Sequence, residues 1–162
     1  MKLLVKKLTD TAKLPNKDRP EDEGWDIFAD ENIVLNAGGV TKVSTGIACA
    51  VEDEYVQVGE CYVDNNGDTQ QDSAYQKYWI QIEGRSGMAS KGVFPVGGIV
   101  DNGYSGEIGV MLCNLTGTGF TITKGDKIAQ LVIRKHYDPE LTEVQSLEET
   151  DRGEKGFGSS GK

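Results

Sequence analysis

The sequence contains few of the residues that build metal centres and disulfide frameworks. It has one histidine and three cysteines among 162 residues. Cys49, Cys61 and Cys113 stand far apart and form no C-x-x-C pair, so the sequence predicts neither a zinc site nor a disulfide framework. Unpaired cysteines of this kind are typical of a reducing compartment, and we therefore expect a cytoplasmic protein.

Positive charge is also scarce. The chain has 17 Lys and Arg residues against 26 Asp and Glu residues, which gives a formal net charge of −9. Such a chain lacks the basic surface that binds nucleic acid without sequence preference, so no nucleic-acid partner is predicted. An anionic ligand would need a few local Lys and Arg residues, or a divalent metal that arrives with it. The apolar runs are too short for a membrane span or a signal peptide, and no membrane contact is predicted.

Sustained helical periodicity is absent, whereas glycine is frequent at 21 residues. Strand-like runs recur at short spacing with turn signals between them, which predicts an all-β antiparallel sandwich or jelly roll. The length fits one domain. The expected strands cover residues 2–8, 25–29, 33–35, 55–63, 75–83, 93–100, 107–114, 118–123 and 127–133, with a hairpin over 39–51 and a single helical turn over 85–91.

The stretch from residue 93 to residue 114 contains the strongest turn signal. Asn102-Gly103 lies between two apolar runs, and both residues tolerate positive φ, so a hairpin is expected here. Asp101 and Tyr104 flank the turn. From the residues alone, Asp101 fits a general base, a partner for a cation, or a solvated turn residue.

Other polar residues stand where a phosphate could bind. Arg85, Ser86 and Gly87 offer a guanidinium, a hydroxyl and a free backbone N–H after a strand, although a solvated turn explains them equally well. Gln130 interrupts an apolar strand and needs either solvent or a polar partner. The segment 64–68 hints at a calcium loop, but its glycine is misplaced and no terminal Glu follows at the required spacing.

Residues 148–162 are charged and then rich in Gly and Ser, with Phe157 as the only large apolar group. Such a segment cannot offset the entropy of ordering by burial, so we predict one β domain over 1–147 and a mobile C-terminal arm over 148–162. The last seven residues satisfy G-x-x-x-x-G-K, but no Ser or Thr and no helix follow, which excludes a nucleotide-hydrolase phosphate loop.

Five short blocks, in this order, resemble the homotrimeric dUTPase family. They are EGWDIFA, GRSGMASKG, the stretch 96–114, KGDKIAQLVI and RGEKGFGSSGK. The resemblance covers nearly the whole chain except residues 58–77. It implies a jelly-roll β-barrel in which three subunits build each of three active sites. The implied reaction is Mg²⁺-dependent hydrolysis of dUTP to dUMP and pyrophosphate, which limits uracil in DNA and supplies dUMP for dTMP synthesis.

The resemblance also implies roles for individual residues. Asp101 would activate the attacking water at the α-phosphorus, and Tyr104 would lie under the deoxyribose and leave no room for a 2′-hydroxyl. Asp26 would support the site near the metal and the arginine. Mg²⁺ would be held through substrate phosphates and water, not by direct protein ligands. The remaining substrate-binding positions would be Gly98, Ile99, Val100 and Gly109 for uracil, Arg85, Ser86, Gly87 and Gln130 for phosphates, and Arg152, Phe157, Gly158, Ser159 and Ser160 in the arm.

Two departures from the family pattern keep every functional group. The first block has Glu23 where Ala is usual, and the second has Gly84 where Pro is usual. A related family, the dCTP deaminases, would place a catalytic Glu where this chain has Met111, which cannot shuttle protons. A non-enzymatic binding module on the same scaffold is the other alternative, and the filled catalytic positions argue against it.

The larger departure is an insertion at about 58–77, between the first and second blocks, which is long for a connection in a compact domain. Some phage members of the family carry extra segments that contact protein partners, so a bacterial or phage-type enzyme with a regulatory arm is one hypothesis and a decorative loop is the other. Deleting residues 59–76 should leave hydrolysis unchanged and abolish retention of a protein partner in a pull-down. A full-length chain that retains no partner would contradict the arm.

Overall fold

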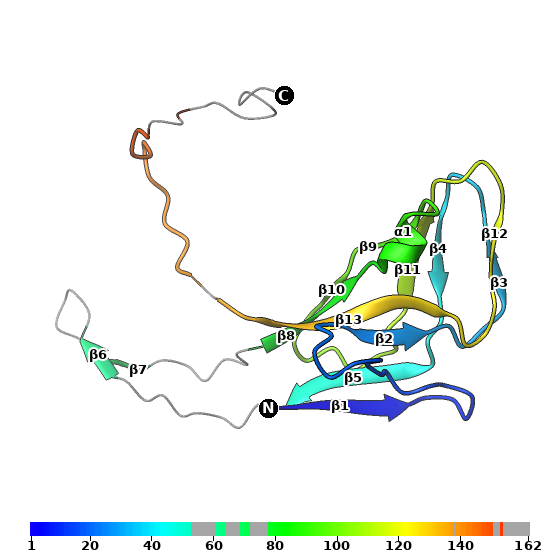
Figure 1. The fold of residues 1–162 in the computed structure, drawn as a ribbon. Coiled ribbons are helices and arrows are strands. Elements are labelled where there is room, and N and C mark those ends of the chain that lie inside the picture. Colours follow the sequence, from blue (N-terminus) through cyan, green and yellow to red (C-terminus); the bar gives the residue numbers. More distant parts are fainter. Residues whose placement is uncertain (53–60, 64–68, 72–77, 138, 151–152, 154–162) are drawn as a thin grey trace.

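The computed structural model describes residues 1–52, 61–63, 69–71, 78–137, 139–150 and 153, and the regular secondary structure among them is almost entirely β-strand (Figure 1). The predicted all-β class is confirmed. The strands are β1 (Lys2–Lys7), β2 (Trp25–Phe28), β3 (Ile33–Leu35), β4 (Val40–Val43), β5 (Ile47–Glu52), β6 (Cys61–Val63), β7 (Thr69–Gln71), β8 (Tyr78–Glu83), β9 (Val93–Val96), β10 (Ile99–Val100), β11 (Val110–Asn114), β12 (Phe120–Ile122) and β13 (Lys127–Lys135).

The described ranges contain one helix, the four-residue α1 (Ser86–Ala89), which confirms the helical turn expected over 85–91. No helix among these residues is both long and apolar enough to cross a membrane. Within the predicted insertion, β6 pairs with β7 in antiparallel register and forms a short hairpin, although no strand was expected at 69–71. Its tip, residues 64–68, lies outside the described residues.

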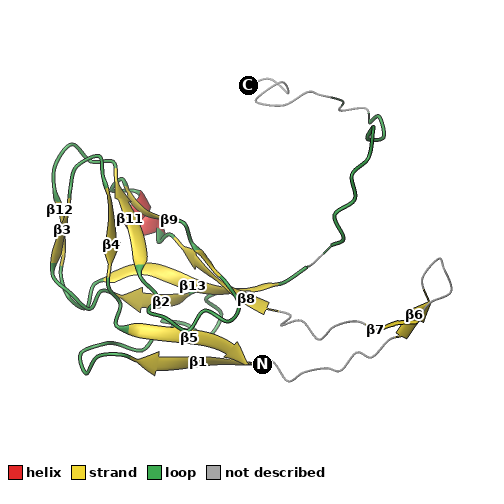
Figure 2. Cartoon of the chain, turned by 180° about the vertical axis from the view of Figure 1, so that it is seen from behind, coloured by secondary structure: helices red, strands yellow, loops and turns green. Residues whose placement is uncertain are grey.

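The strands form antiparallel sheets whose neighbours are distant in the sequence. A four-stranded sheet has the order β10-β8-β13-β2, a three-stranded sheet has the order β4-β11-β9, and β1-β5 and β12-β3 form separate pairs. Figure 2 shows the β1–β5 pair lying alongside the four-stranded sheet, as Figure 1 does from the other side. Consecutive strands thus pass from one sheet to another instead of pairing directly, which is the connectivity of a jelly roll.

The hairpin predicted over 39–51 is wrong in its pairing. Both strands exist, but β4 pairs with β11 and β5 pairs with β1. Gly46 lies between them at φ +65°, in the left-handed region that glycine enters without steric cost. The chain therefore turns a corner at this glycine and enters a different sheet.

The second predicted hairpin is also wrong in part. The run 93–100 divides at Gly97, which has φ +65°, into β9 and β10. β9 pairs with β11, whereas β10 pairs with β8 in the other sheet. The return strand begins at Val110, three residues later than expected. The two strands therefore separate next to the Asn102-Gly103 turn instead of pairing up to it.

The core lies between the sheets and is built by alternation along the strands. The long strand β13 buries Ile128, Ala129 and Leu131 completely. The other side chains without exposed surface are Ile27, Leu35, Val43, Val93 and Leu112. Asn114, which is also fully buried, donates from Nδ2 to the carbonyls of Leu35 and Thr118 at 3.1 and 3.0 Å. The buried amide of Asn114 is thus itself hydrogen-bonded.

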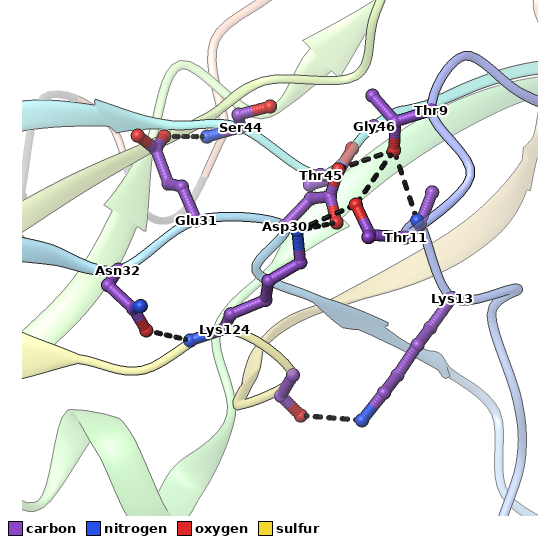
Figure 3. A network of polar contacts seen from close by, with 12 residues as sticks. Thr9, Thr11, Lys13, Asp30, Glu31, Asn32, Ser44, Thr45, Gly46 and Lys124 are labelled. Carbon is purple, nitrogen blue, oxygen red and sulfur yellow. Dashed lines mark hydrogen bonds and ion pairs between the residues drawn. The ribbon is translucent and has the colours of Figure 1, made fainter.

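A polar network fastens the N-terminal loop to this core (Figure 3). Asp30 Oδ2 accepts a 2.5 Å hydrogen bond from the Thr9 hydroxyl, and Asp30 Oδ1 lies 3.1 Å from the Lys124 ammonium. The Thr9 hydroxyl is the main cause that lowers the pKa of Asp30, helped by Thr11 and Lys124 and opposed by burial. A Cβ at Gly46 would lie 2.6 Å from Asp30 Oδ2, so this network requires glycine at the corner.

Candidate active site

A pocket of about 260 Å³ opens where β10 and the start of β11 separate. Gly98, Ile99 and Val100 form one wall, and Gly109 with its neighbours forms the other. These four are the positions predicted to read a base. The full lining is Lys42, Ile82, Val96, Gly97, Gly98, Ile99, Val100, Asp101, Tyr104, Glu107, Ile108, Gly109, Val110 and Met111.

The backbone of Ile99 faces this pocket. The amide of Ile82 donates to the carbonyl of Gly98 at 2.7 Å, so these two residues form a hydrogen-bonded pair of the β8–β10 ladder. In an antiparallel ladder the next pair, Ile99 and Gln81, directs its N–H and C=O groups away from the partner strand. The free edge of Ile99 thus offers one donor and one acceptor side by side, which is what the edge of a nucleobase needs.

Glycine is required at position 98 because β8 and β10 approach closely. A Cβ on Gly98 would lie 2.2 Å from the carbonyl oxygen of Ile82. Gly109 is less restricted, since a Cβ there would lie 2.2 Å from Lys42 Cε, which is the far end of a flexible side chain that can move. The stem of Lys42 therefore covers Gly109 at the pocket wall.

Asp101 and Tyr104 lie on the predicted turn, which the structure confirms. The amide of Tyr104 donates to the carbonyl of Asp101 at 3.1 Å, and Gly103 has φ +84°. Asp101 is exposed, and together with Val100 and Tyr104 it also lines a second pocket of about 390 Å³ against β1 and β5. The second pocket is larger, but its strands β1 and β5 pair with each other over their whole length. The smaller pocket, with its free peptide edge, is the better site for a base.

The ring of Tyr104 is held over Gly106. The phenol hydroxyl donates to the backbone carbonyl of Glu107 at 3.1 Å, and a Cβ on Gly106 would lie 2.5 Å from that hydroxyl oxygen. Half of the tyrosine remains exposed, at 50%. Sequence reasoning missed Gly106 and Glu107. Nothing in the pattern GYSGE indicates that the tyrosine turns back onto both residues.

Arg85, the arginine predicted to bind phosphates, lines neither pocket and is held by its own polar contacts. Arg85 Nε lies 2.8 Å from Asp26 Oδ1, and Arg85 Nη1 donates to the carbonyl of Lys127 at 3.3 Å. The other carboxylate oxygen of Asp26 lies 2.8 Å from the Lys127 ammonium. A guanidinium has five N–H donors, so three remain for a ligand. Asp26 thus has both carboxylate oxygens engaged, one by Arg85 and one by Lys127.

Lys127 and Asp18 were not foreseen from the sequence. The Lys127 ammonium binds Asp18 at 2.6 and 2.8 Å in addition to Asp26. The hydrogen bonds to Asp18 and Asp26 raise the pKa of Lys127. The hydrogen bond from Lys127 is the main cause that lowers the pKa of Asp18. The pair therefore stays ionised at neutral pH. Asp18 comes from a loop 109 residues away from Lys127, a separation at which no sequence signal links them.

Three other predicted phosphate ligands, Ser86, Gly87 and Gln130, belong to the described residues and stand on α1 and β13. Ser86 and Gly87 begin α1 and are exposed. Gln130 lies opposite Asp26 on β2 and Glu83 on β8, and directly opposite residues share one face of a sheet. Its side chain packs over Gly24, where an added Cβ would lie 2.9 Å from the Gln130 Cβ. The arm residues Arg152, Phe157, Gly158, Ser159 and Ser160 lie outside the described residues.

The two groups of residues do not meet within one chain. Val100 lies opposite Ile80, and the antiparallel register brings Asp101 level with Trp79, six residues before Arg85. At the rise of a β-strand this separation is roughly 20 Å. Neither pocket is lined by Arg85, Asp26 or Gln130. One chain thus has the pocket beside Asp101 at one place and the guanidinium of Arg85 at another.

The donor set among the described residues does not form a metal cage. They contain no group of three or more His, Cys, Asp or Glu side chains that could hold a metal ion. Asp26 is engaged by two cations, and Asp101 is a single exposed carboxylate. This arrangement fits a divalent ion only if most of its ligands come from elsewhere, such as phosphate oxygens.

Replacing Asp26 tests the arginine support. Asp26→Ala removes the acceptor of both Arg85 and Lys127 from a buried position, so the free energy of unfolding should fall by about 1–3 kcal/mol. The matched control is Glu83→Ala, which breaks an exposed ion pair with Arg134 and should cost about 0–1 kcal/mol. Urea denaturation measures both. Equal losses would show that the Asp26 contacts act like a surface pair.

The chain is similar to dUTPases in sequence. The dUTPase family model matches residues 73–161. The deoxyuridine 5′-triphosphate nucleotidohydrolase of Rabbitpox virus is 35% identical over 155 residues, which cover 96% of this chain and 90% of the viral protein. The enzyme of the same name from Vaccinia virus is 34% identical over 155 residues, covering 96% of this chain and 90% of that protein.

Solved structures show the same fold. The dUTPase of Staphylococcus bacteriophage 80alpha, solved with dUPNHPP, superposes with a TM-score of 0.77 at 28% identity and covers 99% of this chain and 98% of that chain. The dUTPase from phage phi11 of S. aureus, described with its species-specific insert, has a TM-score of 0.71 at 24% identity over 93% of this chain and 100% of that one. The jelly-roll prediction is therefore confirmed. Together, the sequence matches and the shared fold establish that this chain belongs to the dUTPase family.

Proposed function

We propose that this chain hydrolyses dUTP to dUMP and pyrophosphate. The free peptide edge of Ile99, facing a 260 Å³ pocket with Asp101 at its rim, is the observation that carries this proposal. Uracil would bind to the donor and acceptor of that edge, and the backbone of Gly98, Val100 and Gly109 would complete the wall. Relatives named deoxyuridine 5′-triphosphate nucleotidohydrolase and a neighbour solved with dUPNHPP support the substrate.

Asp101 would act as the general base. Its carboxylate accepts a proton from a water molecule, and the water oxygen then attacks the α-phosphorus. The bond from the α-phosphorus to the bridging oxygen breaks in line with this attack, and the pyrophosphate leaves with that oxygen. The turn places Asp101 on the rim next to the pocket wall, so a nucleotide bound there would present its α-phosphate near the carboxylate.

Tyr104 would exclude ribonucleotides. Its ring lines the pocket beside the turn and is held by the hydrogen bond to Glu107. A deoxyribose packed against a fixed ring leaves no space for a 2′-hydroxyl. Selection in this site would therefore depend on how firmly the ring is held.

The phosphates would bind to the arginine group of a second subunit. Arg85 keeps three N–H donors free, and Ser86, Gly87 and Gln130 lie beside it. Because Arg85 and Asp101 are separated by roughly 20 Å of strand within one chain, a homotrimer with shared active sites would bring them together. Arg152, Phe157, Gly158, Ser159 and Ser160 of the arm over 148–162 would complete the site, as the family resemblance implies.

Mg²⁺ would enter with the nucleotide. When bound, the ion neutralises charge on the phosphate oxygens, which matters for a chain with a net charge of −9. Phosphate oxygens and water would supply its ligands, since the described residues form no cage. Asp26 would take part only by holding Arg85 beside this charge.

The phage proteins among the structural neighbours support a bacterial setting. We propose that the enzyme acts in the cytoplasm of a bacterial cell. The phage 80alpha protein is described as one of the dUTPases that control transfer of virulence genes. A regulatory second role through residues 58–77 is therefore the second candidate function, and the deletion of residues 59–76 tests it.

Asp101→Asn should lower the turnover number for dUTP by a factor of about 100 to 10,000, because the amide cannot accept the proton of water. Binding of dUTP should persist, since the peptide edge of Ile99 is unchanged. Pyrophosphate release from dUTP with Mg²⁺ measures turnover, and calorimetry measures binding. UTP, dTTP and dCTP serve as substrate controls, and ammonia release from dCTP would instead indicate a deaminase. Near-normal turnover of Asp101→Asn would remove this residue from the base role.

Truncation after Glu149 should leave a folded oligomer with strongly reduced hydrolysis. The removed segment contains Arg152, Ser159 and Ser160, and each would contribute a charged or neutral hydrogen bond to the phosphates. A loss of about 100-fold or more in kcat/KM is expected for these contacts together. Size-exclusion chromatography checks the oligomer. Full activity of the truncated chain would exclude the arm from the site.

A further inference from the structure

Glu107 is the best-anchored carboxylate in the nucleoside pocket, and the proposed reaction assigns it no role. Its Oε1 atom accepts hydrogen bonds from the Ser44 hydroxyl, from the Thr45 amide at 3.2 Å and from the Gly46 amide at 2.9 Å. Its Oε2 atom lies 3.7 Å from the Lys42 ammonium, which also lines the pocket. A single side chain thus ties the pocket wall to the corner between β4 and β5.

The backbone of Glu107 is fixed by the same corner. The amide of Ile108 donates to the carbonyl of Ile47 at 2.8 Å, and the Thr45 hydroxyl donates to the carbonyl of Ile108 at 2.5 Å. The carbonyl of Glu107 is therefore held at a defined position on the pocket wall. Tyr104 donates its hydroxyl to that carbonyl at 3.1 Å.

The charge of Glu107 is maintained in this environment. Burial raises the pKa of Glu107, but the Ser44 hydroxyl, the Gly46 and Thr45 amides and the Lys42 ammonium together leave it below its ordinary value. The carboxylate is thus ionised at neutral pH. An ionised acceptor forms stronger hydrogen bonds to the corner than a neutral one would.

We infer that Glu107 is a positioning residue that fixes the ring of Tyr104 and so sets the preference of the enzyme for dUTP over UTP. This inference rests on the proposed function, because Tyr104 must be the group that excludes the 2′-hydroxyl. Glu107 does not touch the reacting atoms. It acts through the backbone carbonyl that receives the tyrosine hydroxyl.

Glu31 provides a matched control. Its Oε1 atom accepts the Ser44 amide at 2.6 Å, so it anchors the same corner through the same kind of bond. Glu31 lines neither pocket and does not contact Tyr104. If Glu107 served only to stabilise the corner, the loss of either carboxylate would have the same effect on substrate choice.

The experiment measures kcat/KM for dUTP and for UTP in the full-length oligomer with Mg²⁺. Glu107→Ala keeps the backbone carbonyl that accepts from Tyr104 but releases it from the corner. The ratio of the two values should fall by about fivefold, the effect expected when the hydrogen bond that positions the ring is weakened. Glu107→Gln keeps an Oε1 acceptor for the corner and should retain most of the ratio. Glu31→Ala should lower the thermal midpoint and leave the ratio unchanged.

Tyr104→Phe deletes the same link from the other side, so it tests the inference even if Glu107→Ala fails to fold. Its ratio of kcat/KM for dUTP to kcat/KM for UTP should fall by about fivefold. The double variant with Glu107→Ala should show a ratio no lower than that of either single variant. An unchanged ratio in Tyr104→Phe, an equal fall in Glu31→Ala, or single effects that multiply would each overturn the inference.

Tyr104→Ala separates this inference from the proposed function. If Tyr104→Ala lowers the ratio of kcat/KM for dUTP to that for UTP and Tyr104→Phe does not, the Tyr104 ring still excludes the 2′-hydroxyl, and the role inferred for Glu107 is wrong. If Tyr104→Ala keeps the ratio, the role of Tyr104 in the proposed function is wrong. The inference about Glu107 is then wrong as well. A wild-type chain that hydrolyses neither nucleotide would overturn the proposed reaction itself.

Discussion

The corner formed by Ser44, Thr45 and Gly46 is the constraint on which the rest of the site depends. At this corner the chain leaves one sheet and enters another, so its amide groups have no strand partner. Carboxylates from other segments accept these hydrogen bonds. Glu31 accepts from the Ser44 amide, and Glu107 accepts from the amides of Thr45 and Gly46. Asp30 lies against the same glycine and ties in the N-terminal loop. Satisfying buried amides at one corner thus also fixes the wall of the nucleoside pocket.

Sequence patterns located the strands well because alternation and turn residues are local signals. The turn at Asn102-Gly103 and the helical turn after Arg85 were both predicted correctly. Pairing was predicted less well. The two expected hairpins failed because Gly46 and Gly97 adopt positive φ and send the chain to another sheet. A glycine in a sequence indicates that such a conformation is available, but only tertiary packing decides whether it is used.

The site itself was predictable only where a motif marks it. Asp101, Tyr104, Arg85 and Asp26 stand in short blocks that resemble a known family. Lys127, Asp18 and Glu107 act through contacts that span 109 and 63 residues, so no window of sequence contains both partners. These supporting residues are visible only after the strands are placed in register. The division between a pocket for the nucleoside and a guanidinium for the phosphates likewise became clear only from the distance between strands.

The free peptide edge of Ile99 has an evolutionary consequence. Recognition through main-chain groups does not depend on the chemical character of the residue that presents them, and the Ile99 side chain is 70% exposed. If this edge reads the base as proposed, position 99 can therefore change among many residue types while base selection is preserved. Its neighbour Gly98 has no such latitude, since any larger residue would collide with the carbonyl of Ile82. The close approach of the two strands therefore restricts substitution at Gly98, although this residue contributes no side chain to the pocket.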